Sequence, residues 1–190
     1  MPITKLDTTP ALVVIDLQKG TAGFPTAHPA AEIIARNALL ARAFREKGLP
    51  VVLVNVAGMP PGRTEAGRPK FEFPPDWTAL VPELQQQPDD YLVTKHCVGA
   101  FTGTPLHDIL HQRGVTQIVL TGIATSAGVE STARTAYDYG YNMVFIVDAM
   151  TDRDAEKHQH CVENFPRLGE RDTTENLLNL LQQQHQAGSL

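Results

Sequence analysis

Two ionisable side chains lie within or directly after segments that are predicted to form buried strands. Asp16 directly follows the apolar run "ALVVI", and Lys95 lies inside the short strand-like segment "YLVTKH". A carboxyl group at a strand exit is a candidate acid or base, although it can also simply satisfy loop amides. A lysine in a strand is expected to be buried only when it is paired. The alternative is a structural ion pair of Lys95 with Asp16 or Asp148. Buried ion pairs do not reliably stabilise a fold, so the presence of such a pair would still favour a functional role over a purely structural one.

The segment "TGIATSAGVESTARTAYDYGY", residues 121–141, reads as the end of a buried strand that runs into a helix. Turns of this kind often carry a nucleophile, but here Gly128 lies between Ala127 and Val129 with no cysteine nearby. The backbone N–H groups of residues 125–129 open the helix, so they are expected to point outward and form an anion or oxyanion cradle. Gly128 would let a ligand approach the backbone closely, and a glycine needed for helix packing is the alternative.

Other side chains near these segments suit structural roles better. Asp148 follows a later strand and is expected to hydrogen-bond the neighbouring turns. Thr125 and Ser126 most simply cap the helix that starts there. Cys97 lies two residues beyond Lys95, so it is either a displaced nucleophile facing the same side or a small buried apolar residue.

Neither the histidines nor the glycines predict a cofactor. His107 and His111 lie four residues apart on one helical face but lack a carboxylate or cysteine partner for a metal ion. His158 and His160 fall on different helical faces and are expected in solvent. The sequence contains no dinucleotide or P-loop glycine pattern, so no nucleotide cofactor is expected.

Strand-like and helix-like segments alternate along almost the whole chain, and this order predicts how the candidate residues come together. Five strands separated by helices or long crossovers predict a single-domain α/β/α sandwich of three layers with a mainly parallel sheet. The carboxyl ends of such strands form the ligand-binding edge, which would gather Asp16, Lys95 and the elbow. The domain is expected to span residues 1–190 with a core of about 9–182 and a frayed tail from 182. The strands are predicted at 11–17, 50–56, 91–96, 116–123 and 141–149, and the helices at 32–47, 104–114, from the elbow to 139, 154–164 and 173–184.

One long segment lacks periodicity. Residues 57–77, "AGMPPGRTEAGRPKFEFPPDW", are rich in proline and glycine. Long loops of this kind in compact domains are usually functional or mobile. We expect this loop to help define a pocket.

Composition excludes several classes of partner. The net charge of −5 and the pI near 5.8 disfavour nucleic acid and anionic membranes, which would repel the protein. The start of the chain lacks the apolar core of a signal peptide, and no run is long enough to cross a bilayer. With only two cysteines, Cys97 and Cys161, a cytoplasmic location is expected.

Four segments resemble the isochorismatase-like hydrolases, which include isochorismatases, nicotinamidases and N-carbamoylsarcosine amidases. They are "ALVVIDLQKG", "VTKHCVGAFTGTPL", "GVTQIVLTGIATSAGVESTARTAYDYGY" and "VDAMTD", and the match extends from Thr9 to about Leu181. The resemblance implies a Rossmann-like α/β/α sandwich that assembles into homo-oligomers, dimers or larger.

The resemblance also implies roles for individual residues. Most members use an aspartate, a lysine and a nucleophilic cysteine, which fall on Asp16, Lys95 and Gly128. A cis peptide that does not involve proline would fall at Ile123–Ala124, with the amides of Ala124 and Gly128 as oxyanion donors. The candidate substrate-binding residues are Phe101, Ala124, Thr125 and Ala127. The nicotinamidase branch binds a metal through an Asp/His cluster after the second strand, where this chain has no histidine, so neither a metal nor another cofactor is expected.

Glycine in place of cysteine removes the covalent route through an acyl-enzyme. Some isochorismatases also have glycine there, and in their reaction an aspartic acid protonates the enol carbon of a vinyl ether before water adds. The resemblance thus implies non-covalent acid catalysis by Asp16 on a small anionic metabolite, although Lys95 should lower the pKa of an acid that needs it raised. An amide or C–N hydrolase that recruits Cys97 or an activated water, and a catalytically silent small-molecule-binding protein, are the alternatives.

Overall fold

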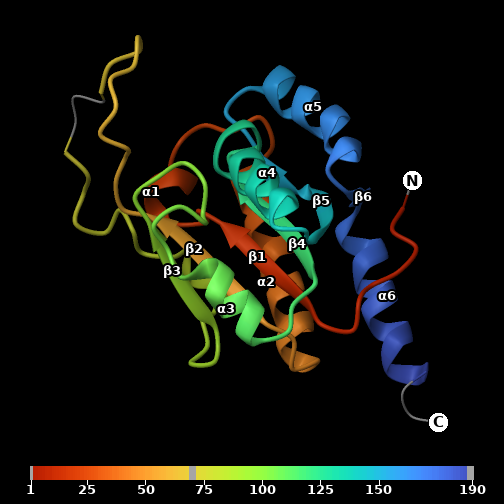
Figure 1. The fold of residues 1–190 in the computed structure, drawn as a ribbon. Coiled ribbons are helices and arrows are strands. Elements are labelled where there is room, and N and C mark those ends of the chain that lie inside the picture. The colour runs from red at the N-terminus through yellow and green to blue at the C-terminus, as the bar shows by residue number, and fades with distance from the viewer. Residues whose placement is uncertain (1, 69–71, 188–190) are drawn as a thin grey trace.

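The computed structural model describes residues 2–68 and 72–187 and shows one parallel sheet between two layers of helices (Figure 1). The strand order is β3-β2-β1-β4-β5-β6. Every paired strand in this order is parallel, as expected when helices or long crossovers connect the strands. The strands are β1 Pro10–Ile15, β2 Val51–Val56, β3 Tyr91–Lys95, β4 Gln117–Ile123, β5 Asn142–Thr151 and β6 Glu170–Asp172.

The helices divide between the two faces of the sheet, which confirms the predicted three-layer α/β fold. Helices α2 and α6 cover one face, and α3, α4 and α5 cover the other (Figure 1). The α-helices are α1 Lys19–Ala22, α2 Ala30–Glu46, α3 Leu106–Gln112, α4 Glu130–Asp138, α5 Ala155–Asn164 and α6 Thr174–Ala187. Three shorter helical turns are η1 Pro82–Leu84, the π-helical η2 Thr125–Val129 and η3 Phe165–Arg167.

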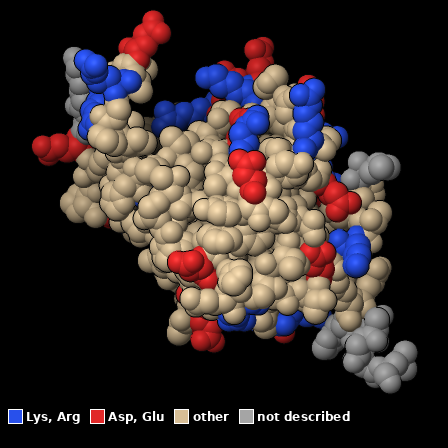
Figure 2. Space-filling view, in the orientation of Figure 1, with Lys and Arg blue, Asp and Glu red and all other residues tan. Residues whose placement is uncertain are grey.

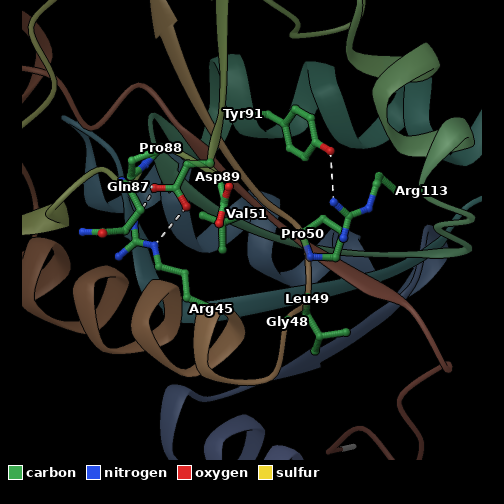
Figure 3. A pocket seen from close by; sticks show the side chains of 11 residues that line it. Arg45, Gly48, Leu49, Pro50, Val51, Gln87, Pro88, Asp89, Tyr91 and Arg113 are labelled. Atoms are coloured by element: carbon green, nitrogen blue, oxygen red, sulfur yellow. Dashed lines mark hydrogen bonds and ion pairs between the residues drawn. The ribbon is translucent and has the colours of Figure 1, made fainter.

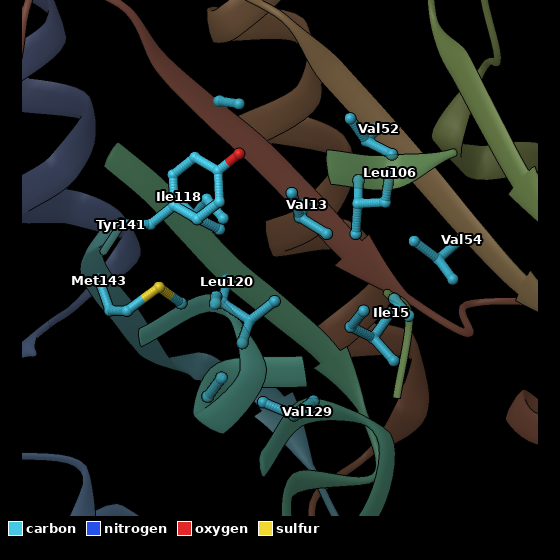
Figure 4. Packing of buried hydrophobic residues seen from close by; sticks show 14 of the residues in the cluster. Val13, Ile15, Val52, Val54, Leu106, Ile118, Leu120, Val129, Tyr141 and Met143 are labelled. Carbon is cyan, nitrogen blue, oxygen red and sulfur yellow. The ribbon is translucent and has the colours of Figure 1, made fainter. Parts of the chain in front are cut away.

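The central strand β1 shows why its sequence is apolar without interruption. All six of its residues are buried, because the sheet is covered on both sides. Val13 and Ile15 pack in the core beneath α3 and α4 (Figure 4), while Leu12 and Val14 pack in the core beneath α2 and α6. Successive side chains of this one strand thus pack alternately into two separate hydrophobic cores.

A sixth strand was not predicted. Strand β6 has only three residues, Glu170–Asp172, and pairs with β5 through Val144, Phe145 and Ile146. Its sequence, Glu-Arg-Asp, lacks the apolar run that identifies the other strands, since an edge strand of this length need not be buried on both faces. The tail also differs from expectation: α6 continues through Ala187, whereas residues 188–190 lie outside the described part of the chain.

The long loop after β2 is anchored at its end. The indole Nε1 of Trp77 donates to the Val56 carbonyl at 3.0 Å, and Gln18 Nε2 donates to the Trp77 carbonyl at 2.8 Å. A Cβ on Gly20 would lie 2.4 Å from the Trp77 ring, so the ring sits against bare backbone. Residues 69–71 of the loop lie outside the described part. The anchored end of the loop adjoins the carboxyl ends of β1 and β2, which is the edge of the sheet where a ligand pocket is expected.

Gly122 is the glycine whose replacement should cost most stability. Its φ is +117°, and a Cβ there would lie 2.1 Å from the Ile15 carbonyl oxygen on the neighbouring strand. Gly122→Ala combines an unfavourable backbone angle with a backbone clash, so it should lower the free energy of unfolding by at least about 3 kcal/mol in urea titrations. Gly62→Ala is the control, because nothing lies within 4 Å of that Cβ position. Equal losses in the two variants would contradict the explanation.

The surface in Figure 2 carries charges of both signs. On this face, Lys, Arg, Asp and Glu lie mostly around the edge, and neither sign forms a continuous patch. Within the described residues, no helix has the length and apolar character that a membrane span requires.

Candidate active site

Asp16 and Lys95 form a buried ion pair at the carboxyl edge of the sheet. The distance from Lys95 Nζ to Asp16 Oδ2 is 2.9 Å, and the two side chains are only 2% and 8% exposed. Lys95 ends β3 and Asp16 follows β1, so the lysine reaches across the end of β2. Its Nζ also donates to the Cys97 carbonyl at 3.2 Å. Of the two partners that the sequence left open for Lys95, the structure selects Asp16.

Burial raises the pKa of Asp16, contrary to the effect expected from Lys95 alone. The pKa rises from its ordinary value of 3.8 to about 6 because desolvation outweighs the opposing charge and hydrogen bond of Lys95. Asp16 Oδ1 is buried and finds no hydrogen-bond partner in the described part of the protein. An unpaired buried carboxylate oxygen is costly, whereas a protonated one can donate to a bound molecule. Asp16 is therefore mostly protonated below about pH 6, well above the pH at which an ordinary aspartate ionises.

The elbow after β4 is present, but most of its amides are already engaged. The Ile123–Ala124 peptide is cis, as the resemblance implied. The Ser126 amide donates to Asp152 Oδ2 at 2.7 Å, and the amides of Ala127 and Val129 both donate to the Ala124 carbonyl. The prediction that residues 125–129 all direct free amides outward is therefore wrong for these three. The amides of Ala124 and Gly128, which the resemblance implies as oxyanion donors, stay the candidates for an anion cradle.

Gly128 faces the acid directly. A Cβ at this position would lie 3.5 Å from Asp16 Oδ2, 3.0 Å from Ile15 Cγ2 and 3.4 Å from the Val98 carbonyl oxygen. A side chain at 128 would therefore project beside the Asp16 carboxyl group. With glycine there, that space is open to a bound molecule or to water.

A pocket of about 200 Å³ lies over these groups and draws on the ends of five strands. Asp16, Lys95, Ala124, Ala127 and Gly128, all predicted from the sequence, line it together. Cys97 also lines the pocket and is partly exposed, so it is not the inert buried thiol that was the alternative. The remaining lining residues are Thr21, Phe24, Thr26, Val56, Gly58, Met59, Pro60, Val98, Ile123 and Arg153.

Two residues predicted to bind substrate do not line this pocket. Phe101 is only 7% exposed and packs against Tyr139 and Tyr141, with ring centroids 5.4 and 6.3 Å away. Thr125 is fully buried, and its hydroxyl pairs with Nδ1 of His158 at 2.8 Å. The prediction that Phe101 and Thr125 bind substrate directly therefore finds no support in this pocket.

His158 is a correction to the sequence analysis, because it is buried and not in solvent. Besides its bond to Thr125, its ring packs edge-on to His28 at 4.7 Å between centroids. Burial, together with the nearby His28, lowers the pKa of His158 against the opposing effect of Asp152, so the neutral ring is favoured. Thr125 and Ser126 do not cap the helix with their side chains. The Asp152 carboxylate performs that role at Ser126.

Other polar candidates are structural. Asp148 lies within β5, and its Oδ1 accepts hydrogen bonds from the Thr174 amide and hydroxyl at the start of α6, in line with the expected structural role. His107 stacks on Tyr139 at 4.1 Å and pairs with the Tyr141 hydroxyl. Among the described residues, no three His, Cys, Asp or Glu side chains group in a way that would hold a metal ion.

Sequence analysis missed Arg153 and Phe24. The Arg153 guanidinium carbon lies 3.9 Å from the centroid of the Phe24 ring, and both residues line the pocket. Arg153 comes two residues after β5 ends, so the rule that sites form at strand ends would have identified it.

A larger cavity of about 670 Å³ lies at the opposite edge of the sheet, near the starts of β2 and β3 (Figure 3). Its charged groups are mostly paired: Arg45 binds Asp90 through two nitrogens at 3.0 and 2.7 Å, and Arg113 donates to the Tyr91 hydroxyl. It lacks the acid and the elbow, so the smaller pocket is the candidate active site.

The chain is similar to known proteins of one family. Residues 10–175 match the model of the isochorismatase domain family. The isochorismatase family protein YwoC of Bacillus subtilis is 41% identical over 176 residues, covering 88% of this chain and 92% of its own length. A solved isochorismatase family protein from Burkholderia thailandensis is 40% identical with a TM-score of 0.89, covering 93% of this chain and 97% of its own. Ureidoacrylate amidohydrolase RutB of Methylobacterium radiotolerans is 31% identical, covering 78% of this chain and 69% of its own length.

Proposed function

Since the chain belongs to the isochorismatase family of hydrolases, we propose that it hydrolyses a vinyl-ether type bond in a small anionic metabolite by non-covalent acid catalysis. The observation that carries the proposal is the Asp16 carboxyl group, whose pKa is raised to about 6 beside a position, Gly128, that offers no nucleophile. Acid chemistry requires a proton donor and space for substrate, and both are available at this point in the pocket. The proposed assembly is a cytoplasmic homo-oligomer.

The proposed reaction begins with transfer of the Asp16 proton to the terminal enol carbon, which leaves an oxocarbenium ion. Water then adds to the cationic carbon, and its released proton returns to the Asp16 carboxylate. The resulting hemiketal collapses into a ketone and an alcohol, which breaks the C–O bond. Lys95 holds the carboxyl group in place and stabilises the carboxylate after transfer, while the amides of Ala124 and Gly128 serve as donors to substrate oxygen.

The test is turnover of an enolpyruvyl ether such as isochorismate, followed by coupled detection of the released pyruvate. Wild-type protein should release pyruvate, and Cys97→Ala should retain the rate within about threefold, because no thiol takes part. Alkylation is a poorer test, since a group added to Cys97 would fill the pocket that this residue lines.

An amide or C–N hydrolase is the second candidate, favoured by the position of Cys97 in the pocket and by the similarity to an amidohydrolase. It predicts amide turnover that Cys97→Ala abolishes if the thiol attacks. If water activated by Asp16 attacks, amide turnover survives Cys97→Ala and is lost in Asp16→Asn. Ligand binding without turnover of ethers, amides or ureas would instead favour a silent binding protein.

A further inference from the structure

Arg153 is a cation at the pocket that the proposed proton transfer does not use. Its guanidinium lies over the face of Phe24, with 3.9 Å between the guanidinium carbon and the ring centroid. Phe24 in turn meets Trp77 edge-on, with ring centroids 6.0 Å apart. This stacking restrains an otherwise flexible exposed side chain and leaves its N–H donors at the edge of the guanidinium plane.

The acidic residues beside Arg153 are engaged elsewhere. Asp152 accepts the Ser126 amide on Oδ2 at 2.7 Å and the Arg153 amide on Oδ1 at 2.8 Å. Asp154 Oδ1 accepts the amides of Glu156 and Lys157 at the start of α5. Within residues 2–68 and 72–187, the Arg153 guanidinium forms no hydrogen bond or ion pair with another residue. Its hydrogen-bonding capacity is therefore unused.

The charges of the pocket lining do not cancel. Asp16 and Lys95 neutralise each other as a pair, and among the residues that the structure describes Arg153 is the only other charged one in the lining. Protonation of Asp16 for acid catalysis would make the lining more positive still. The protein as a whole carries −5, so this local excess of positive charge opposes the overall charge. A local cation of this kind attracts anions that the remaining surface repels.

We propose that Arg153 is the specificity-determining residue of the site and that it binds a carboxylate of the substrate at the pocket wall formed with Phe24. The inference deepens the proposed function and rests on it for the identity of this pocket as the substrate site. The substrate class is a small carboxylate whose reacting bond lies near Asp16 while its charged group pairs with Arg153. Arginine suits this task better than lysine, because the N–H donors of its planar guanidinium group can bind both carboxylate oxygens while the guanidinium face stays stacked on the aromatic ring.

The experiment measures binding by calorimetry with two probes of similar shape, maleate and its neutral diamide, maleamide, and each mixture is analysed afterwards to check that neither probe was hydrolysed. Wild-type protein should bind maleate about five- to tenfold more tightly than maleamide, because a partly solvated charged pair contributes modestly. Arg153→Gln should remove this preference and leave maleamide binding unchanged, and Arg153→Lys should retain part of it. Arg42→Gln makes the same charge change on an exposed side chain of α2 outside the pocket and should retain all of it.

Three results would overturn the proposal: no preference for maleate in the wild type, the same preference in Arg153→Gln, or equal weakening of both probes in that variant. The last would mean that Arg153 only supports Phe24. Neither probe needs to react, so the outcome is independent of turnover. If enolpyruvyl ethers are not hydrolysed but maleate binding depends on Arg153, the proposed reaction fails and the carboxylate site stands.

Discussion

Asp16→Asn should lower kcat for an enolpyruvyl ether by about 10²- to 10⁴-fold, the range over which general acids contribute to catalysis. Asparagine has nearly the same shape but no proton to give at the required acidity. The variant leaves Lys95 without its carboxylate partner, so folding must be checked by circular dichroism and by maleate binding through Arg153. Asp148→Asn is the control, because Asp148 lies within β5 and contacts Thr174 and Arg36 outside the pocket. Unchanged turnover in Asp16→Asn would remove Asp16 from the mechanism.

The same residue predicts the pH dependence of the wild-type rate. The pKa of Asp16 is raised to about 6, so the acid is mostly protonated below this pH and mostly ionised above it. The rate should be nearly constant at lower pH and fall about tenfold per pH unit above about 6, as the protonated fraction falls. A profile that stays flat from acid to neutral pH, or that rises with pH, would contradict acid catalysis by this group.

The central part of the fold was predictable because a strand that is buried on both faces consists of consecutive apolar residues. Strand β1 is an unbroken apolar run, and the rule that sites form at strand ends places Asp16, Lys95 and the elbow at one edge of the sheet from the sequence alone. Glycines that end helices were equally readable: Gly114 and Gly140 both have positive φ, at +64° and +87°. These signals are local, and each is a property of one segment.

What could not be predicted depends on contacts between distant segments. His158 was assigned to solvent because helical spacing does not reveal that Thr125 and His28 pack against it. The pKa of Asp16 is raised, although Lys95 alone would lower it. The residues next to Asp16 in the sequence do not reveal how deeply its carboxyl group is buried. The elbow amides were assigned to a ligand, yet Asp152, the residue after β5, accepts a hydrogen bond from one of them. Tertiary packing determined each of these outcomes.

Gly128→Cys should create amide hydrolysis that the wild type lacks, with a rate at least about a hundredfold above the wild-type background. The backbone at 128 does not have a positive φ, so a side chain is tolerated there once Ile15 Cγ2, 3.0 Å from the new Cβ, shifts slightly. The new Cβ would lie 3.5 Å from Asp16 Oδ2, which brings the introduced thiol within reach of a carboxylate that can take its proton. The Ala124 and Gly128 amides would then serve the tetrahedral intermediate.

The measurement is hydrolysis of a panel of small carboxylate-bearing amides, combined with mass spectrometry of the protein to detect an acyl-enzyme. Gly128→Ala separates the effect of filling the space from that of the thiol, and Gly128→Cys combined with Asp16→Asn removes the proton acceptor. Only the single cysteine variant should acquire both the activity and the covalent adduct, because attack needs thiol and carboxylate together. If the thiol reacts with iodoacetamide no faster than an ordinary cysteine and no adduct forms, the elbow is not oriented for attack. In that case glycine at 128 is not the single change that separates acid catalysis from nucleophilic catalysis in this chain.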